Sequence, residues 1–303
     1  MKLSDKIAAV GKMQKYIINH LNEKITLDEL SRTSGYSKFY AMRMFKDLSG
    51  ETPYDYIRSL RLTKAAEKLR DNGGKVIEAA LESGFDSHDG FTRAFERRFG
   101  ITPKKYAEEK PAIPYFTHHP VSAYYILKEK DITMENERVP RTVTVTAVER
   151  PKRKLILLRA INTKDGNYEA YCEEMGCDWE GLLNSIPEKF APAGLLTLPD
   201  CLVTPGTSNT ASGVEVPIDY TKPIPEGYDV IELQPCTMLF FQGSPYENED
   251  DFCLAIEIAW QAVDNYEPTR YGYEFAYELA PVFNFGANEK MGALQAVPVK
   301  TKK

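Results

Sequence analysis

The sequence predicts a multidomain chain, with an all-α double helix-turn-helix region at residues 1–110, a linker at residues 111–132 and an α+β region at residues 133–303. Three observations predict it. The first hundred residues carry apolar side chains three or four positions apart, interrupted at glycine and proline. The later residues alternate strand and helix patterns in an order that repeats, β-α-β-β, which indicates a duplication. A length of 303 residues with 43% hydrophobic side chains is sufficient for two cores.

Charge is distributed unevenly between the two regions. Residues 1–110 hold 21 basic and 16 acidic side chains, a net charge of +5, whereas residues 111–303 hold 17 and 28, a net charge of −11. A basic region suits a polyanion, and an acidic region is repelled by one and attracts cations. Ordinary variation in surface charge is the alternative interpretation.

Composition limits the location of the protein and its chemistry. The longest apolar runs, at residues 155–158 and 238–241, are far shorter than the roughly 20 residues that cross a bilayer. Five cysteines, an odd number with no C-x-x-C pair, favour a reduced cytoplasmic protein. We expect no metal or other cofactor, because His118 and His119 lack spaced Cys or carboxylate ligands. The standard nucleotide-binding, serine-hydrolase and zinc-protease motifs are absent from the sequence, so we expect no enzyme.

The first predicted helix-turn-helix unit follows a packing helix at residues 7–21. Thr26 and Glu29 form a capping box at the start of a short helix that ends at Gly35. Ser37 then caps a helix at residues 38–48. Its periodic apolar residues are Phe39, Met42, Phe45 and Leu48. Such a turn sets two helices at a steep angle.

A second unit repeats this arrangement fifty residues later. A short helix at residues 76–83 is followed by a turn at Gly84, and Ser87 caps a helix whose buried stripe is Phe91, Phe95 and Phe99. A long helix, with Pro53 at its first position and an end at residues 72–74, connects the units. Roughly 18 residues make a strut of about 27 Å. Two recognition helices held at that distance are spaced to enter successive major grooves, which recur about every 34 Å on one face of DNA.

Residues 8–107 resemble the DNA-binding domain of the AraC/XylS family of regulators. The matching strings are LSRTSGYS at 30–37, PYDYIRSLRL at 53–62, GFDS at 84–87, FTRAF at 91–95 and FGITPKKY at 99–106. The ordered set with the family spacing is far more specific than a single helix-turn-helix pattern. The resemblance implies a sequence-specific DNA-binding transcription regulator.

The resemblance places base-facing positions on the second helix of each unit. The candidate DNA-binding residues are Ser37, Lys38, Phe39, Met42, Arg43, Lys46, Ser87, His88, Arg93 and Arg97. Arg43 and Arg93 are the best candidates for bidentate contacts to guanine. Phe39 and Met42 either touch a thymine methyl group or pack inward, and His88 either reads a base or is solvated. Lys46, Arg97 and Arg98 suit phosphates, and we expect Asp89 to cap or orient its helix.

The pattern of the acidic region predicts two copies of the same succession of strands and helix. In the first copy, strands at 142–148 and 155–160 are predicted to form a hairpin around Pro151, before a helix at 168–186 and strands at 194–198 and 213–218. The second copy comprises strands at 228–233 and 237–242, a helix at 249–265, and strands at 271–279 and 292–299.

Residues 133–300 resemble the GyrI-like effector-binding domains. The matching strings are PGTS at 205–208, GVEVP at 213–217, PIPEGY at 223–228 and PVK at 298–300. The resemblance implies a pocket between the two repeats, lined by aromatic rings, often with a buried glutamate that faces a cationic ligand. The candidate effector-binding residues are Trp179, Glu215, Tyr228, Trp260, Tyr273, Glu278 and Phe283. Glu215 is the preferred anionic contact because it lies in a matched string.

Further candidates have an equally good structural explanation. The predicted strand places Tyr271, Phe275 and Tyr277 on the same face as Tyr273, where they either pack in a core or line a pocket. Glu274 and Glu278 share the opposite face, which is consistent with exposure to solvent.

We therefore expect a cytoplasmic regulator that binds double-stranded DNA and a small apolar or cationic effector, with RNA polymerase as a candidate partner. Two alternatives for the acidic region remain. It is either a small-molecule hydrolase with a buried glutamate as general base, or a ligand-free module that binds RNA polymerase or gyrase.

Overall fold

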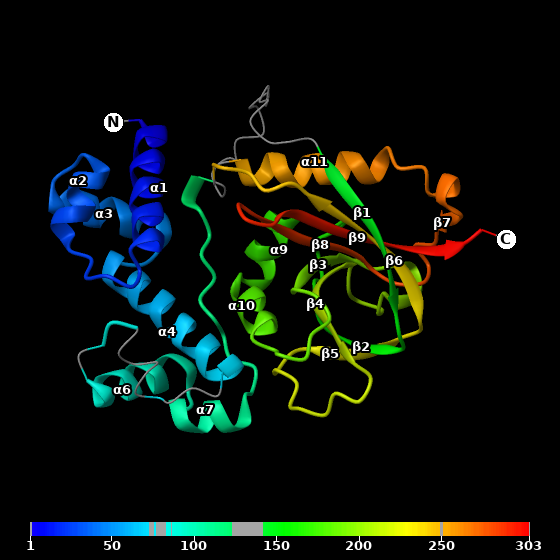
Figure 1. The fold of residues 1–303 in the computed structure, drawn as a ribbon, viewed down its shortest axis with the longest axis horizontal. Helices are drawn as coiled ribbons and strands as arrows, with labels where there is room; N and C mark the ends of the chain where they lie inside the picture. Colours follow the sequence, from blue (N-terminus) through cyan, green and yellow to red (C-terminus); the bar gives the residue numbers. More distant parts are fainter. Residues whose placement is uncertain are drawn as a thin grey trace. The chain divides into compact units, whose positions relative to one another are not determined.

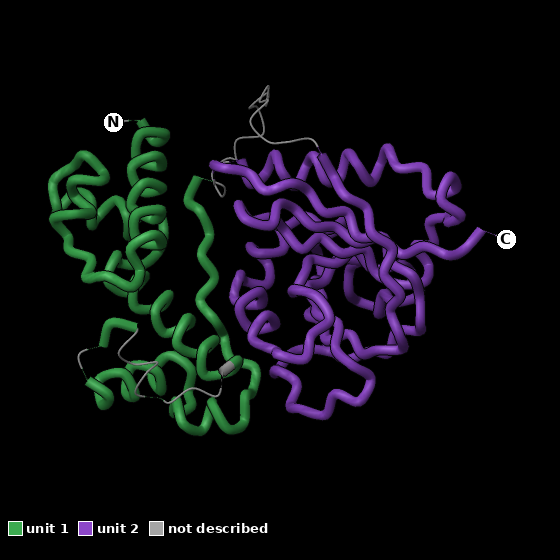
Figure 2. Tube along the Cα trace, viewed as in Figure 1, with its two compact units in different colours: residues 1–130 green, residues 131–303 purple. Residues whose placement is uncertain are grey.

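The computed structural model describes residues 2–72, 76, 83–85, 87–122, 142–248 and 251–302. The chain divides into two compact units, unit 1 at residues 1–130 and unit 2 at residues 131–303 (Figure 2). None of the described helices is long and apolar enough to cross a membrane.

Unit 1 begins with three helices, α1 (Leu3–Asn19), α2 (Leu27–Ser34) and α3 (Lys38–Ser49), shown in blue in Figure 1. The predicted capping box of α2 is present, with Glu29 N donating to Thr26 Oγ1 at 3.3 Å and Thr26 N donating to Glu29 Oε2 at 2.7 Å. Gly35 ends α2 at φ 75°, a left-handed conformation that glycine adopts at little cost. The three helices pack around the first core of unit 1, which contains Val10, Met13, Ile17, Leu30 and Phe45.

The predicted strut is the helix α4 (Pro53–Asn72), and it supplies two separate cores. Tyr56 and Ile57 pack into the first core, and Leu62 and Leu69 pack into a second core. The second core also holds α6 (His88–Phe99) and α7 (Pro103–Glu109), through Phe91, Phe95, Phe99 and Tyr106. The prediction of a short helix at 76–83 lies mostly outside the described residues, and Val76 alone is described as helical.

Residues 111–122, predicted as part of a linker, instead pack along both cores of unit 1. Tyr115 is buried in the second core, where its hydroxyl is 2.7 Å from the Tyr106 hydroxyl, and Val121 is buried in the first core. Phe116 N donates to Thr63 Oγ1 at 2.8 Å. The three prolines of this segment predict irregular chain, and the sequence also favours partial ordering by its aromatic residues Tyr115 and Phe116. Both residues pack against the cores of unit 1, because the apolar side chains between the prolines are spaced to reach them.

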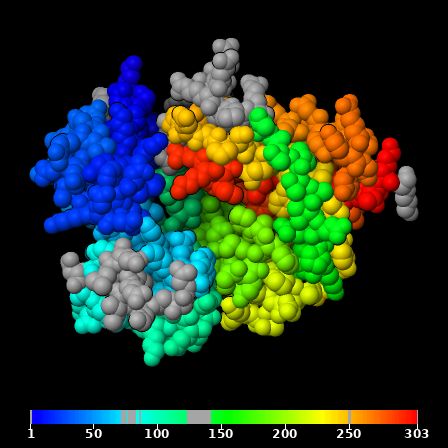
Figure 3. All heavy atoms as spheres, in the orientation of Figure 1, coloured from blue at the N-terminus to red at the C-terminus, as the bar shows by residue number. Residues whose placement is uncertain are grey.

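Unit 2 is a single antiparallel sheet with helices. The strands are β1 (Val143–Arg150), β2 (Arg153–Arg159), β3 (Gly194–Thr197), β4 (Thr210–Pro217), β5 (Asp229–Leu233), β6 (Cys236–Gly243), β7 (Tyr273–Phe275), β8 (Val282–Asn288) and β9 (Gly292–Thr301). Eight of them follow the order β1-β6-β9-β8-β3-β4-β2-β5, and β7 pairs with β9. β1 forms one edge and runs along the surface of the unit (green in Figure 3).

The predicted hairpin between the first two strands was wrong. β1 pairs with β6, and β2 pairs with both β4 and β5. A two-residue hairpin turn needs positive φ at its first central residue, and Pro151, with φ fixed near −65°, excludes it. The two halves of unit 2, β1–β4 and β5–β9, show the same pairing pattern. The first strand of each half pairs with the second strand of the other half, as in β1–β6 and β5–β2. The second strand of each half pairs with the last strand of its own half, as in β2–β4 and β6–β9. The β3–β8 pair joins the two halves.

Two further predictions in unit 2 need correction. The helix expected at 168–186 is two helices, α9 (Tyr168–Met175) and α10 (Asp178–Asn184), separated at Gly176, where φ is 79°. The strand expected at 271–279 is reduced to the three residues of β7, and the longer β8 was missed. The alternation of side chains between the two faces of β8 is interrupted by a shift in its register with β9, between Asn284 and Ala287.

Helices α9, α10 and α11 (Phe252–Asp264) cover the same face of the sheet. One row of residues runs across five strands: Ser212, Leu195, Asn284, Gln295 and Phe241. Tyr171 of α9 donates to Ser212 Oγ at 2.9 Å at one end of this row. At the other end, Phe241 packs with Val263 of α11. The β3–β8 seam therefore lies between the two groups of helices.

Candidate functional site

Helix α3 presents a basic surface with one exposed aromatic ring. Its buried side chains are Ala41, Met44 and Phe45. Lys38, Phe39, Arg43 and Lys46 are exposed, and Met42 is half-buried. Phe39 is 74% exposed, so the alternative in which it packs inward was wrong. The buried stripe starts two positions later than its apolar pattern suggests, which frees Phe39 at the start of the helix.

The two predicted serine caps differ. Ser87 Oγ accepts a hydrogen bond from Gly90 N at 3.1 Å, as predicted. Ser37 occupies the corresponding position before α3, but its side chain makes no capping hydrogen bond within the described part of the chain. Its hydroxyl is exposed, and the neighbouring Lys38 Nζ lies 2.6 Å from Asp28 Oδ1.

Helix α6 has the predicted two faces. Phe91, Phe95 and Phe99 are buried. The exposed side chains are His88, Asp89, Arg93, Glu96 and Arg97, whereas Arg98 is half-buried. Asp89 does not cap the helix, because Ser87 does. The Asp89 carboxylate lies 3.7 Å from His88 Nδ1 instead. Half-burial makes Arg98 a weaker candidate for a phosphate than Arg97.

Arg61 on α4 connects the two helix-turn-helix units. Its Nε donates to the Leu21 carbonyl at 2.9 Å, and its Nη2 donates to the Glu23 carbonyl. A Cβ atom added to Gly84, in the turn of the second unit, would lie 2.9 Å from Arg61 Nη1. Gly84 also has φ 69°, a left-handed conformation that favours glycine, and the Arg61 guanidinium would have to shift to make room for a larger side chain. The basic surfaces of α3 and α6 thus share one scaffold.

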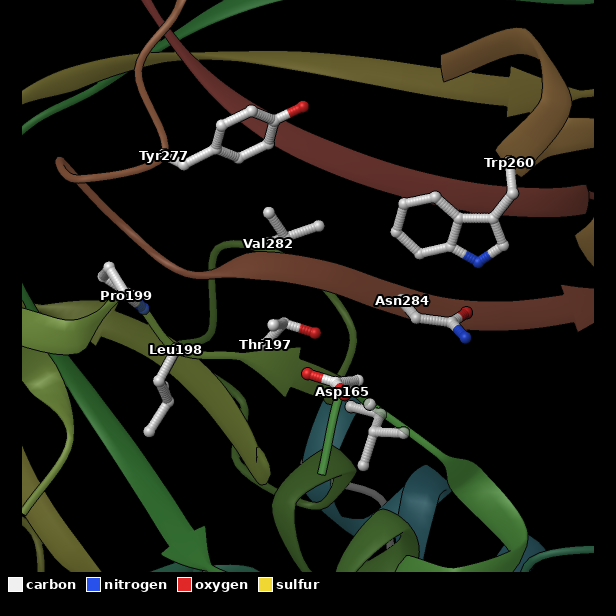
Figure 4. A pocket seen from close by; sticks show the side chains of 10 residues that line it. Asp165, Thr197, Leu198, Pro199, Trp260, Tyr277, Val282 and Asn284 are labelled. Carbon is white, nitrogen blue, oxygen red and sulfur yellow. The ribbon is translucent and has the colours of Figure 1, made fainter. Parts of the chain in front are cut away.

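Unit 2 contains a cavity of about 550 Å³ at the β3–β8 seam (Figure 4). Opposed residues of these strands, Leu195 with Asn284 and Thr197 with Val282, form its floor. The remaining lining residues are Asp165, Gly166, Leu198, Pro199, Trp260 and Tyr277. This volume lies within the range of small-molecule sites, as does a largely apolar lining with a few polar groups. Among the described residues, no cluster of His, Cys, Asp and Glu can hold a metal ion.

Glu215 is not the free carboxylate that the sequence suggested. It is 4% exposed, with Oε1 2.5 Å from Arg153 Nε and Oε2 3.2 Å from Arg150 Nε. Two guanidinium groups already neutralise it, and it does not line the cavity described above. Because Glu215 lies outside the cavity, it is not placed to act as a general base on a molecule bound there.

Of the other candidates for the effector pocket, Trp260 and Tyr277 line the cavity. Phe283 is buried on the opposite face of β8, in the core with Leu155 and Leu196. Glu278 is exposed, and its Oε1 lies 3.3 Å from Lys300 Nζ. Three others lie elsewhere: Trp179 packs against Tyr168 and Tyr171, Tyr228 lies near Tyr171, and Tyr273 packs in the core beneath α11.

Sequence reasoning missed most of the cavity. Val282 and Asn284 flank the predicted Phe283, but the strand that carries them was missed, so the face that each residue occupies was not predicted. Asp165, at the end of the loop before α9, has φ 56° and exchanges hydrogen bonds with Asn209. Its Asp-Gly sequence is a turn signal that predicts this local geometry, although not its place beside Thr197.

The geometry of unit 1 defines a class of protein. Two exposed, mostly basic helices, each following a tight turn and both fixed to one long helix, are the recognition elements of a double helix-turn-helix DNA-binding protein. A family model described as a helix-turn-helix domain matches residues 30–109.

Known proteins support this class. The regulatory protein SoxS of Escherichia coli (strain K12) is 37% identical over 91 residues, which are 30% of this chain and 85% of SoxS. The transposon Tn10 TetD protein of Escherichia coli is 41% identical over 95 residues, 31% of this chain and 69% of that protein. The chain belongs to the AraC family of helix-turn-helix transcriptional regulators, which bind DNA sequence-specifically.

Two other matches are partial. The right origin-binding protein of Escherichia coli (strain K12) is 37% identical over 102 residues, and the match spans about a third of each chain, 34% of this one and 35% of that protein. A crystal structure of a probable AraC family transcriptional regulator from Rhodopseudomonas palustris CGA009 is 27% identical, covering 33% of this chain and 95% of that chain, with a TM-score of 0.32.

Proposed function

We propose that unit 2 controls this AraC-type regulator by binding a small apolar or cationic molecule at the β3–β8 seam. The observation that carries the proposal is the cavity of about 550 Å³ between α11 and the loop before α9. We further propose that unit 2 is a GyrI-like fold. The recurrence of strand pairing in its two halves, and the position of the cavity at their junction, support that assignment.

The lining favours an aromatic or aliphatic ligand with a positive charge. Trp260 and Tyr277 offer ring faces, which attract cations and apolar groups (Figure 4). The Asp165 carboxylate is exposed in the same cavity and takes the role that the sequence assigned to Glu215. Asn284 Oδ1 accepts from the buried Gln295 Nε2 at 3.1 Å, which leaves the Asn284 amide donor to orient a ligand.

The fluorescence of Trp260 tests this site directly. Trp179 and Trp260 are the two tryptophans of the chain. A Trp179→Phe variant therefore reports from the cavity, and a Trp260→Phe variant reports from outside it. We expect phenyltrimethylammonium to change the emission and raise the melting temperature of the Trp179→Phe variant. No change in either property up to millimolar probe would contradict the proposal.

A matched substitution separates charge from shape. Asn tolerates the left-handed backbone of Asp165, so Asp165→Asn removes the charge with little strain. We expect this variant to bind phenyltrimethylammonium about three- to tenfold more weakly and to bind its neutral isostere, tert-butylbenzene, unchanged. An equal loss for both probes would assign Asp165 a structural role only.

We also propose that Arg43 and Arg93 read bases, and that Lys46 and Arg97 contact phosphates. All four side chains are exposed on α3 and α6. On a site selected from a random pool, Arg43→Ala and Arg93→Ala should each lose about 1 to 3 kcal/mol of binding, whereas Lys46→Ala should weaken all sequences similarly. Equal weakening of selected and random DNA by the arginine changes would show that neither arginine reads bases.

A further inference from the structure

The corner between α9 and α10 brings two cysteines together. Cys172 lies in the last turns of α9, and Cys177 directly precedes α10. Gly176 between them has φ 79°, and its N–H closes the end of α9 by donating to the Cys172 carbonyl at 3.0 Å. This corner places both thiol groups at one turn of the chain, close enough for each to shift the pKa of the other.

The two thiols have different environments. Cys177 is exposed, and Cys172 is half-buried beside the aromatic side chain of Tyr168. A hydrogen bond donated by Cys172 lowers the pKa of Cys177. The same hydrogen bond, followed by burial, raises the pKa of Cys172. Redox-sensitive cysteines combine these features: an exposed thiol that ionises readily and a second thiol close enough to resolve its oxidised form.

We propose that Cys172 and Cys177 are a reversible dithiol–disulfide pair, in which Cys177 reacts first with a hydroperoxide. The Cys177 thiolate attacks a peroxide oxygen, an S–O bond forms, the O–O bond breaks and hydroxide leaves. With hydrogen peroxide this step gives a sulfenic acid. The Cys172 sulfur then attacks the Cys177 sulfur, the S–O bond breaks, and the Cys172 proton leaves with the oxygen as water. Two thiols are oxidised and one peroxide is reduced to two waters.

Peptide mapping of the full chain tests the product. Residues 165–189 lie between the cleavable Lys164 and Lys189, contain no internal Lys or Arg, and carry Cys172 and Cys177 but none of the other three cysteines. After stoichiometric hydrogen peroxide and alkylation, we expect this tryptic peptide to be unalkylated and lighter by two hydrogen atoms. Dithiothreitol should restore double alkylation. A doubly alkylated peptide, or disulfides to other cysteines, would overturn the proposal.

Variants test the order of the steps. In Cys172→Ser, Cys177 should stop at the sulfenic acid, which dimedone traps. Cys201 is an exposed cysteine whose Sγ approaches a backbone carbonyl rather than a second thiol, so Cys201→Ser is the matched control and should leave the disulfide unchanged. If Cys172→Ser gives no dimedone adduct at Cys177, then Cys177 is not the first thiol to react.

The wild-type chain provides a test that needs no folded variant. Iodoacetamide at neutral pH should alkylate Cys177 about tenfold faster than Cys201, because the thiolate is the nucleophile. Equal rates at the two exposed cysteines would remove Cys177 as the reactive thiol. This proposal concerns the α9–α10 corner and does not depend on the cavity at the β3–β8 seam.

Discussion

Glu215 lies at the centre of a buried charge cluster with more positive than negative charge. Arg153 is fully buried, and its Nη1 also donates to the Gln234 carbonyl at 3.0 Å. The Arg150 guanidinium lies over the rings of Phe240, at 5.0 Å, and Phe190, at 5.5 Å, and its burial lowers its pKa. Glu215 therefore stabilises two guanidinium groups that have left water, a structural role.

Neutralising Glu215 should destabilise unit 2. In Glu215→Gln the two guanidinium groups lose their counterion, and breaking a buried ion pair in this way costs about 3 to 5 kcal/mol. Urea unfolding followed by tryptophan fluorescence measures the loss, because both tryptophans lie in unit 2.

Glu232 is the matched control for this prediction. It lies on β5, next to β2, and its Oε2 is 2.7 Å from Lys152 Nζ, but both side chains are exposed. Exposed ion pairs contribute little to stability, so Glu232→Gln should leave the unfolding midpoint almost unchanged. Similar losses in the two variants would mean that the burial of Glu215 is not what makes its pairing important.

Glu174 should make unit 2 sensitive to acid. Desolvation raises its pKa, but hydrogen bonds from Thr163, Asn162 and Ile161 outweigh it and lower the pKa from 4.5 to about 2. A lowered pKa stabilises the fold above the unfolded value, and this stabilisation is lost as the pH falls toward 2. The stability difference between wild type and Glu174→Gln should therefore be present at pH 7 and shrink between pH 4.5 and 2. A difference that does not change with pH would refute this assignment.

At the scale of elements, one buried side chain anchors the end of residues 111–122 to the first core of unit 1. Gln14 on α1 is 1% exposed. Its Oε1 accepts from Val121 N at 2.9 Å, and its Nε2 donates to the His119 carbonyl at 3.1 Å and to the Tyr56 hydroxyl at 3.3 Å. The side-chain amide of Gln14 thus connects α1, α4 and the end of residues 111–122.

Gln14→Leu should release this segment locally. The substitution approximately keeps the volume of the side chain but removes the acceptor of the Val121 N–H. A buried N–H without an acceptor costs about 1 to 3 kcal/mol. We expect amide hydrogen exchange at Val121 to accelerate at least tenfold. Phe116 N, which donates to Thr63 Oγ1, is the internal control and should exchange as in the wild type. Unchanged exchange at Val121 would show that Gln14 does not hold the segment.

The elements that sequence predicted well are those whose signals are local. The capping box at Thr26, the proline that starts α4 and the phenylalanine stripe of α6 each depend on residues within one or two helical turns. Strand pairing in unit 2 depends on residues far apart, so the separate strands were largely identified while the partners of β1 and β2 were not. Gly176 is an intermediate case, because a glycine in a helical pattern is as often tolerated as it is a break.

The candidate sites follow the same rule. Arg43 and Arg93 are exposed as predicted, because helix periodicity fixes which side chains face solvent. The cavity depends on the register of β3 against β8, and a shift of one residue exchanges the faces. The sequence analysis predicted no strand at β8, so nothing fixed which face Phe283 occupies, and its neighbours Val282 and Asn284 face the cavity instead.

For the whole molecule, the separation of charge determines how DNA binding responds to salt. The chain carries −6 in total, yet residues 1–110 carry +5. Exposed cations gather on the two recognition helices: Lys38, Arg43, Lys46, Arg93 and Arg97. Each contact with a phosphate releases condensed counterions, so we expect these side chains to drive DNA binding despite the net negative charge of the rest of the chain.

The full chain should therefore lose DNA affinity steeply as salt rises. With about six phosphate contacts, affinity falls roughly a thousandfold between about 50 and 200 mM salt. Lys46→Ala should reduce the slope of log affinity against log salt by about one. Lys290→Ala removes the same charge from an exposed turn of unit 2 and should leave the slope unchanged, because the proposed phosphate contacts lie on α3 and α6. Fluorescence anisotropy of labelled DNA over this salt range measures all three slopes. If Lys290→Ala changed the slope as much as Lys46→Ala does, the effect would come from net charge alone and not from contacts made by the recognition helices.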